Sequence, residues 1–146
     1  MRKIIQTVIL LFAATMVLMP AINAYDPEGA QPQTEGDLIA IDIDRYFEED
    51  QCYCTIEVQN NDPNQVITTN FWVQLRQDSP TGRYLGEVYV TEDLSPAESY
   101  ITDPINFSWQ EGGHYLYTEV DWRHSVYETD EDNNWYHEYF RNTQEQ

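Results

Sequence analysis

The sequence predicts an all-β domain, a two-sheet antiparallel β-sandwich of about seven strands. Apolar and polar residues alternate with period two in several short segments, which is typical of strands with one buried and one solvated face. Turn-forming clusters separate these segments at intervals of roughly 8–15 residues. No stretch after the N-terminus has a helical period of useful length. A closed barrel is the main alternative, because it uses the same strand pattern.

The first 24 residues predict a secretory signal peptide. Arg2 and Lys3 form a basic start, residues 4–19 are largely apolar, Pro20 ends that run, and Ala24 is a small residue suited to cleavage. An uncleaved anchor is less favoured, because the apolar run is short for a bilayer core of about 30 Å. The expected organisation is a signal peptide at 1–24, a flexible leader at 25–36, one β-sandwich at 37–141 and a C-terminal tail at 142–146.

The mature chain is strongly acidic. Without Arg2 and Lys3 it keeps five cations, all of them arginine, against 26 Asp and Glu residues, which gives a formal charge of −21. A surface of this kind excludes nucleic acid and anionic membranes as partners. Heavy acidity without lysine is typical of a saline habitat, where salt screens the repulsion between carboxylates. Compositional drift is an equal alternative.

Seven strand segments are expected in the sandwich domain. The inward positions of the first three are Leu38, Ala40 and Ile43, then Cys52, Cys54, Ile56 and Val58, then Phe71, Val73 and Leu75. Residues 46–51 are expected to be an acidic connection between the first two strands. Pro104 interrupts the fifth strand, which places that strand at a sheet edge or at a bulge. The last four strands are expected at residues 84–90, 99–107, 114–120 and 135–140.

The two cysteines, Cys52 and Cys54, lie on the same face of one predicted strand. A bridge between residues two apart along a strand requires a distorted backbone, because their Cα separation is close to the disulfide limit of about 7 Å. Three interpretations stay open: small buried hydrophobic side chains, a strained local bridge, or thiols that form an intermolecular disulfide. A lone Cys-x-Cys pair does not supply the four ligands of a structural zinc site.

Residues 121–134 form an acidic connection between the last two strands, with six acceptor side chains within seven positions. Such side chains bond to backbone N–H groups in turns, or gather around a cation. Asp130, Asp132 and Asn134 copy the first three ligand positions of an EF-hand loop, but the glycine and the bidentate glutamate of that loop are absent. A looser calcium site is kept as a hypothesis, with the ligands Asp121, Glu128, Asp130 and Asp132.

The favoured interpretation of the same connection is structural. The connection is longer than a tight hairpin, so several of its backbone N–H groups lack ladder partners and cannot be buried unpaired. Glu128 and Asn134 are expected to supply the missing hydrogen-bonding groups. Val126 is expected to close the end of the sandwich as an apolar plug.

Eight residues at the end of the domain have a distinctive spacing: Val120, Asp121, Val126, Glu128, Asp130, Glu131, Asn133 and Asn134. This spacing resembles the C-terminal motif of the CARDB domain, the cell-adhesion-related domain found in bacteria. Weaker matches lie at Asp37-Leu38, at Val58-Gln59-Asn60 and at Leu94-Ser95-Pro96. The sequence departs from the family pattern at Asn61-Asp62, Ala97 and His114, where glycine, glycine and tyrosine are common.

The resemblance covers residues 37 to about 140 and implies an immunoglobulin-like antiparallel β-sandwich that binds or spaces and does not catalyse. It also implies a structural turn motif made of Asp121, Val126, Glu128, Glu131, Asn133 and Asn134. The residues themselves also indicate a non-catalytic protein, since the sequence contains no nucleophile elbow, no phosphate loop and no paired-histidine zinc motif. His114 is expected to face inward, and His124 and His137 are expected at the surface.

These features predict a secreted, non-catalytic module for binding, adhesion or assembly outside the cell or at the cell surface. The alternative is a carbohydrate- or calcium-dependent ligand-binding module; no other cofactor is expected. Trp72, on a predicted outer face, is the best candidate for contact with a ligand or partner. The expected partners are an extracellular protein, a polysaccharide or a second copy of the chain. Nucleic acid is not expected, nor is membrane insertion after signal cleavage.

Overall fold

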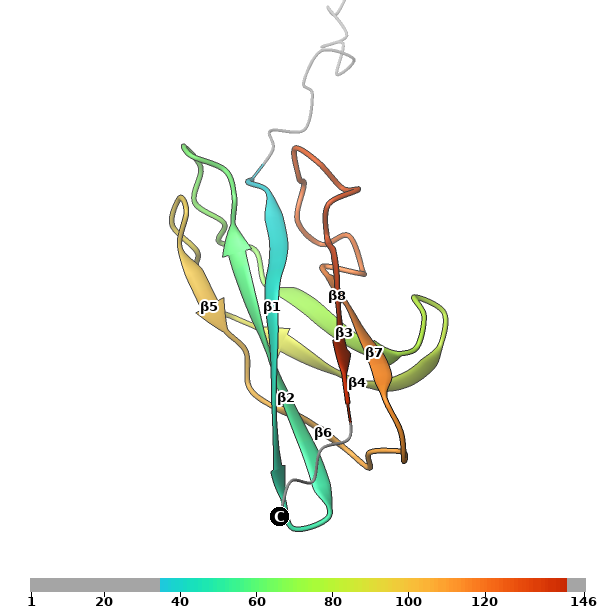
Figure 1. The fold of residues 1–146 in the computed structure, drawn as a ribbon. Coiled ribbons are helices and arrows are strands. Elements are labelled where there is room, and N and C mark those ends of the chain that lie inside the picture. The colour runs from blue at the N-terminus through green and yellow to red at the C-terminus, as the bar shows by residue number, and fades with distance from the viewer. Residues whose placement is uncertain (1–34, 142–146) are drawn as a thin grey trace, which may run out of the picture. The chain divides into compact units, whose positions relative to one another are not determined.

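A computed structural model describes residues 35–141; the predictions made for the signal peptide, for the flexible leader up to residue 34 and for the C-terminal tail lie outside this range. Eight strands form two four-stranded antiparallel sheets (Figure 1). The first sheet consists of β1 (Leu38–Glu48), β2 (Gln51–Asn60), β5 (Ser99–Ile101) and β6 (Ile105–Phe107). The second has the strand order β4 (Arg83–Val90), β3 (Phe71–Gln77), β7 (His114–Val120) and β8 (Trp135–Phe140).

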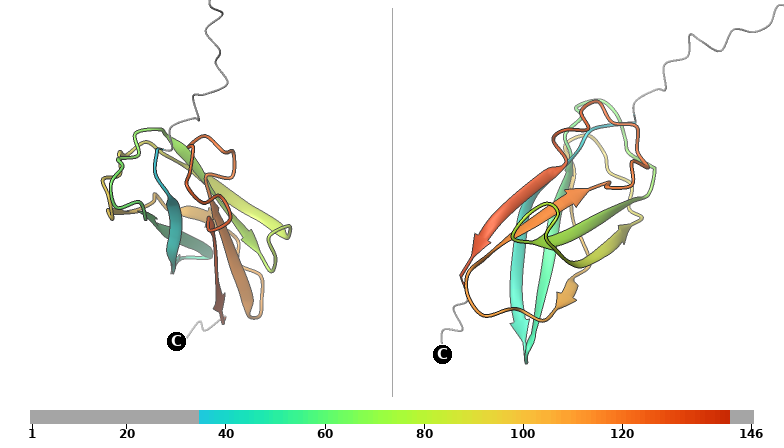
Figure 2. Two further views of the ribbon diagram at one scale, coloured as in Figure 1. Left: turned by 90° about the horizontal axis from the view of Figure 1, so that it is seen from above. Right: turned by 90° about the vertical axis from the view of Figure 1, so that its right-hand side faces the viewer.

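The two sheets form two layers around one apolar core (Figure 2). Inward residues of both sheets fill it, and its largest fully buried side chains include Phe71, Leu38, Ile43, Ile56, Leu75 and Leu116. No ladder joins the two sheets among the described strands, so the predicted sandwich is confirmed and the barrel alternative is wrong. Within residues 35–141 no helix has the length and apolarity that crossing a membrane requires.

A bulge in β1 explains why its inward positions change from even to odd numbers. The pairing of β1 with β2 shifts in register between Ala40 and Asp42. An extra residue at such a point reverses the faces of all residues that follow it. Leu38 and Ala40 are therefore buried before the shift, and Ile43 after it, as the sequence predicted.

The prediction of an acidic connection at residues 46–51 is wrong. β1 continues to Glu48 and β2 begins at Gln51, so the hairpin turn has only two residues, Glu49 and Asp50. Tyr46 and Tyr53 face each other across the two strands and stack with ring centroids 5.2 Å apart. Aromatic cross-strand pairs of this kind stabilise a hairpin. The β1–β2 ladder therefore continues through this segment although its outward residues are acidic.

The fifth predicted strand is divided at Pro104, which gives eight strands where about seven were expected. β5 and β6 both pair with β2 at the edge of the first sheet, as the proline predicted. Thr102 bridges the gap between them, since its backbone N–H donates to the carbonyl of Ile56 and its hydroxyl accepts from the Ile56 N–H, both at 3.0 Å. The side chain thus replaces a ladder bond that the break removes.

Both cysteines are free and fully buried on the inner face of β2. The hydrogen bond to Cys52, together with burial, raises the pKa of the Cys54 thiol. This arrangement supports the interpretation as small buried side chains, and no local bridge is formed. An intermolecular disulfide through Cys52 or Cys54 stays a prediction, and it would require the core to open, because neither side chain is exposed.

Candidate functional site

The connection between β7 and β8 lies at the same end of the sandwich as the start of β1 (Figure 1). Backbone hydrogen bonds join the two segments directly. The N–H of Glu35 donates to the carbonyl of Tyr127 at 2.8 Å, and the N–H of Thr129 donates to that of Gly36 at 3.0 Å. Gly36 and Glu128 also form an isolated parallel bridge. The connection therefore holds the beginning of the first strand.

Glu128 is the central side chain of this contact and is only 8% exposed. Its Oε2 accepts the backbone N–H of Leu38 at 2.5 Å, and its Oε1 accepts the Asn134 side-chain amide at 2.8 Å. Burial raises the pKa of Glu128 to about 8, although both of these hydrogen bonds act in the opposite direction. The carboxyl group thus links β1 to the end of the connection inside the protein, where its charge is disfavoured.

Asp121 shapes the beginning of the connection. It is fully buried and has a positive φ of 47°, a conformation that aspartate adopts more readily than most residues. Its two carboxylate oxygens accept the backbone N–H groups of Ser125 at 3.0 Å and Val126 at 2.7 Å. Val126 is 1% exposed and belongs to the core, so the predicted apolar plug is present. The buried N–H groups of this turn are satisfied by a side chain of the turn itself.

Asp37 connects two loops at this end of the sandwich. Its Oδ1 accepts the side-chain amide of Asn133 at 2.9 Å, and its Oδ2 accepts that of Asn61 at 2.7 Å. Asn61 stands where the resemblance would place a glycine, and its backbone N–H also donates to the Asp37 carbonyl at 2.6 Å. The loop after β2 and the last connection are therefore both bound to the residue that precedes β1.

Glu131, the remaining member of the structural turn motif, lies at the surface. Its Oε1 accepts the backbone N–H of Glu128 at 3.4 Å, and its Oε2 lies 3.0 Å from Nδ1 of His124. The hydrogen bond with Glu131 raises the pKa of His124. Both side chains of this pair are exposed, so solvent screens their attraction. His124 is a surface residue, as predicted.

The four predicted calcium ligands are not gathered into one site. Asp121 and Glu128 are buried and use their oxygens for the N–H donors described above, whereas Asp130 and Asp132 are exposed. Asp130 Oδ1 accepts the backbone N–H of Asp132 at 3.0 Å, which is a local turn bond. Over residues 35–141, no group of three or more His, Cys, Asp or Glu side chains is arranged to hold a metal ion.

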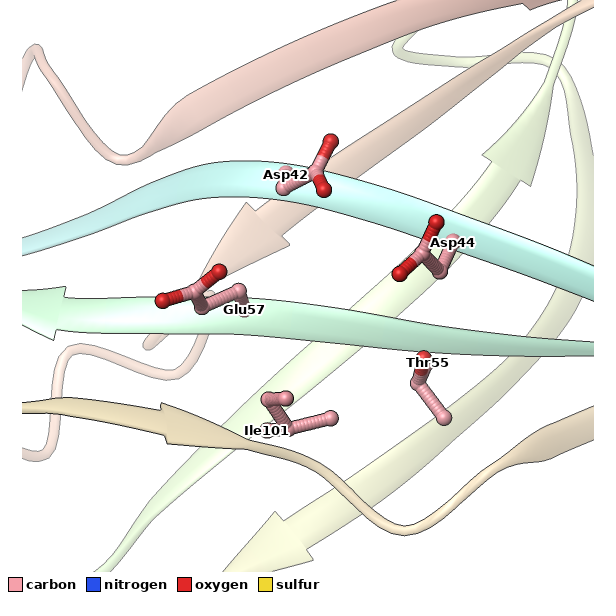
Figure 3. A pocket seen from close by; sticks show the side chains of 5 residues that line it. All are labelled: Asp42, Asp44, Thr55, Glu57 and Ile101. Carbon is pink, nitrogen blue, oxygen red and sulfur yellow. The ribbon is translucent and has the colours of Figure 1, made fainter.

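A small acidic pocket lies on the outer face of the first sheet (Figure 3). Asp42 and Asp44 of β1 face Glu57 and Thr55 of β2, and Ile101 closes one side. Asp42 and Asp44 were predicted on the solvated side of their strand, which this position confirms. The lining residues include three carboxylates and no cation, so this face of the domain is strongly negative.

The outer face of the second sheet has a different character, because it is rich in aromatic side chains. We call it the aromatic face and define it by Trp72, Tyr84, Tyr89, Tyr115, Tyr117, Trp135, His137 and Tyr139. Five of these side chains are between 39% and 50% exposed: Tyr84, Tyr89, Tyr115, Trp135 and Tyr139. The pairing of β4, β3, β7 and β8 brings them to one side of the sheet.

Trp72 lies on this outer face, as the alternation in its strand predicted. Its ring packs against Tyr89 with centroids 4.7 Å apart, and the guanidinium of Arg123 lies 4.3 Å from its centroid. Arg123 also lies 4.6 Å from the ring of Trp122 and forms an ion pair with Glu87 at 2.9 Å. Sequence patterns do not predict the contact with Arg123, which comes from the turn after β7, 51 positions along the chain.

A second aromatic cluster covers β7 and β8. Tyr117 and His137 stack with centroids 4.9 Å apart and planes 14° apart, and Tyr115 and Tyr139 lie 5.0 Å apart. These are cross-strand neighbours in the β7–β8 ladder. His137 is exposed, in agreement with the prediction that it lies at the surface.

His114 lies at the opposite end of the sandwich and is largely buried, as expected, but it is not a purely apolar core residue. Its Nδ1 is 2.9 Å from a carboxylate oxygen of Asp78, and its ring meets Trp109 edge to face at 5.6 Å. His114, His124 and His137 belong to separate parts of the fold. They do not form a shared metal site.

Comparison with known proteins identifies the fold. No protein-family model matches the sequence, and no curated protein is significantly similar to it. A CARDB domain from Pyrococcus furiosus, crystallised in complex with di-metal ions, matches with a TM-score of 0.53 and 21% identity, over 75% of this chain and 96% of that chain. Its solution structure gives a TM-score of 0.52 over the same shares. A domain from Methanosarcina acetivorans, of a protein provisionally named as a cell surface protein, gives 0.53 and 20% identity, over 73% and 90%.

These levels of identity establish the fold alone. The resemblance to CARDB domains and the predicted immunoglobulin-like sandwich are confirmed at that level. The Pyrococcus furiosus domain was crystallised with di-metal ions, whereas residues 35–141 of this chain hold no group of three or more His, Cys, Asp or Glu side chains arranged for a metal ion. The acidic connection is instead a set of hydrogen bonds that closes one end of the sandwich.

Proposed function

We propose that the protein is a secreted, non-catalytic module that binds a partner outside the cell or at the cell surface, and that it does so through the aromatic face. The observation that carries this proposal is the exposure of five large aromatic side chains on one side of the second sheet. Tyrosine, tryptophan and arginine are the residues enriched in contact surfaces, because they combine a large apolar area with a polar group.

Two further observations support the proposal. A domain of the same fold comes from a protein provisionally named as a cell surface protein. Two of the four carboxylates that the sequence offered as candidate ligands, Asp121 and Glu128, accept backbone hydrogen bonds, Asp121 within the connection and Glu128 from the start of β1. They are therefore unsuited to general acid–base work on a bound substrate, which requires access to the reacting group.

Retention on cells tests the binding function. Fluorescently labelled secreted protein is added to intact cells of the source organism, washed, and measured in the cell fraction. We expect retention that falls when Tyr115 is changed to Ala and persists when Tyr46 is changed to Ala. Tyr46 is a matched control, since it is 43% exposed against 44% for Tyr115 and lies on the outer face of the other sheet. No retention, or equal loss in both variants, contradicts the proposal.

A calcium-dependent mode of binding is the second candidate, because the relative from Pyrococcus furiosus was crystallised with di-metal ions. In this chain it would use the exposed carboxylates Asp130 and Asp132, so the hydrogen bonds of the buried Glu128 would not need to break. The same retention measurement with calcium and with a chelator separates the two modes. Binding through the aromatic face alone persists in chelator, whereas the calcium-dependent mode is lost there.

The absence of catalysis is tested directly. We expect the purified protein not to hydrolyse oligosaccharides, esters or peptides under conditions in which it is retained on cells. Hydrolysis that disappears on changing one carboxylate would overturn the non-catalytic part of the proposal and leave the binding part intact.

A further inference from the structure

The two outer faces of the sandwich differ in charge. On the first sheet, Asp42, Asp44 and Glu57 point outward, and none of the outward residues of β1 and β2 is a cation. On the aromatic face, the carboxylates of Glu87 and Glu119 are matched in number by the guanidinium groups of Arg76 and Arg123. In a chain with a formal charge of −19, this is a locally neutral surface. Its partner is therefore selected by something other than net charge.

The exposed apolar area of this face is entirely aromatic. Within residues 35–141, the two large aliphatic side chains that are exposed, Val66 at 48% and Ile101 at 61%, lie elsewhere. Each exposed tyrosine presents an apolar ring and a polar hydroxyl group. A face of such rings matches a partner that is itself half apolar and half hydroxylated.

The rings are held in place before any partner arrives. Tyr117 stacks on His137, Tyr115 packs on Tyr139, and Trp72 contacts both Tyr89 and the guanidinium of Arg123. Side chains that are already ordered lose little conformational entropy on binding. The β-sheet therefore presents a pre-organised platform of ring faces and edges.

Paired hydrogen-bonding groups lie between the rings. Arg76 Nε donates to Oε1 of Gln74 at 3.1 Å, and the Gln74 amide donates to the Glu119 carboxylate. The guanidinium carbon of Arg76 lies 5.6 Å from the ring centroid of Tyr84, and Tyr117 of β7 is the register partner of Arg76. Arginine, carboxylate and tyrosine hydroxyl groups together offer both donors and acceptors to a row of hydroxyl groups.

We infer that the aromatic face binds an uncharged polysaccharide, with sugar rings stacked on its tyrosine side chains and sugar hydroxyls bonded to the polar groups between them. This inference rests on the proposed function and names the chemical class of the partner. Aromatic side chains favour ligands that present a flat apolar face, and a few polar groups fix the orientation of the ligand.

The charge pattern decides against the other partners. A polyanionic glycan is repelled by the mature charge of −21, and a polycation is attracted to the acidic pocket on the other face. A second copy of the chain carries the same excess of negative charge, so the two copies repel each other unless salt screens them. An uncharged polymer is neither repelled by the acidic chain nor drawn to the acidic pocket on the other face.

Affinity electrophoresis tests the inference with defined probes: dextran and glucomannan as uncharged polymers, polygalacturonate as a polyanion and chitosan as a polycation. We expect at least one uncharged polymer to retard the full secreted protein. Tyr115→Ala and Tyr139→Ala should each weaken that retardation about tenfold, because each removes one ring contact, whereas Tyr46→Ala should leave it unchanged. Denaturation curves confirm that each variant is folded. Retardation by the charged polymers alone, or equal effects of all three variants, overturns the inference.

Treated cells separate this inference from the proposed function. Periodate oxidation destroys the vicinal diols of surface polysaccharides, and proteinase treatment removes surface proteins. The inference predicts that retention on cells is lost after periodate and kept after proteinase. Loss after proteinase alone would show a protein partner and overturn the inference while the proposed function stands. The absence of any retention on untreated cells would overturn both.

Discussion

Glu128 accepts a hydrogen bond from the backbone N–H of Leu38, which lies 90 residues earlier in the chain, at 2.5 Å. β1 is an edge strand of the first sheet, so some of its N–H groups have no neighbouring strand to pair with. Leu38 is fully buried, and its N–H cannot be satisfied by water. The Glu128 carboxyl group therefore supplies the acceptor that a neighbouring strand would otherwise provide at the start of β1.

The buried carboxyl group gives the fold a specific pH dependence. Burial raises the pKa of Glu128 to about 8 in the folded protein, above the 4.5 of an unperturbed glutamate. Between these values the folded state binds more protons than the unfolded state. The free energy of unfolding therefore falls as pH rises from about 4.5 to 8, and stays level above that. We expect urea denaturation to show a decrease of up to about 5 kcal/mol across this window, because each pH unit contributes about 1.4 kcal/mol.

The control for this prediction is Glu128→Gln, which is neutral at all pH values and keeps a side-chain oxygen that can accept the Leu38 N–H. Burial also raises the pKa of Asp121 and Glu119, so the wild type and the variant share a background slope of the same sign. The difference between the two proteins isolates Glu128. Equal slopes in the wild type and in Glu128→Gln would show that Glu128 does not titrate in this window.

Ala97 has a positive φ of 61°, in the left-handed region that favours glycine. The resemblance to CARDB domains places a glycine at this position, and the structure gives the physical reason. We predict that Ala97→Gly stabilises the fold by roughly 1 kcal/mol, because the Cβ atom is strained there. Chemical denaturation measures the change. Ser99→Gly, in the extended backbone of β5, should instead destabilise by roughly 0.5–1 kcal/mol, and stabilisation of both variants to the same extent would contradict this account of Ala97.

The excess of carboxylates predicts stabilisation by salt. The sequence has 26 acidic residues against seven lysines and arginines, and the outer face of the first sheet carries the three carboxylates Asp42, Asp44 and Glu57. Their repulsion extends over a Debye length of about 10 Å at 0.1 M salt and is screened at higher concentrations. We expect the melting temperature to rise between low and molar NaCl. A flat profile would remove the argument for a saline habitat.

The sequence predicted the sheets well where a strand has one buried and one solvated face. The alternation of β2 is complete, and Cys52, Cys54, Ile56 and Val58 are all fully buried, as expected. It failed at residues 46–51, because the outward residues there are acidic and composition alone does not separate a solvated strand from a loop. The stacking of Tyr46 on Tyr53 favours the strand over the loop, and this contact depends on the register of two strands.

The candidate sites were predictable only in part. The spacing of the last connection predicted that Glu128 and Val126 are structural, and both are buried. The partner of Glu128 could not be predicted, because Leu38 lies 90 residues away and is brought near by the packing of the two sheets. In the same way, the outward position of Trp72 followed from its strand, but its contact with Arg123 depends on the turn after β7.

The central claim is that the acidic connection holds the start of β1 through the buried carboxyl group of Glu128. Glu128→Ala removes the acceptor for the Leu38 N–H and for the Asn134 amide, and leaves both donors buried. We expect it to cost roughly 1–3 kcal/mol of unfolding free energy.

Asp132→Ala is the matched control, since this carboxylate belongs to the same connection and is exposed. Its substitution should change the free energy by no more than about 0.5 kcal/mol. The most direct test is chemical denaturation of both variants in chelator, where no ion can contribute. A large loss for Glu128→Ala beside a small one for Asp132→Ala is the predicted result. The same small loss for both would contradict the account and would show that the connection is only a solvated loop.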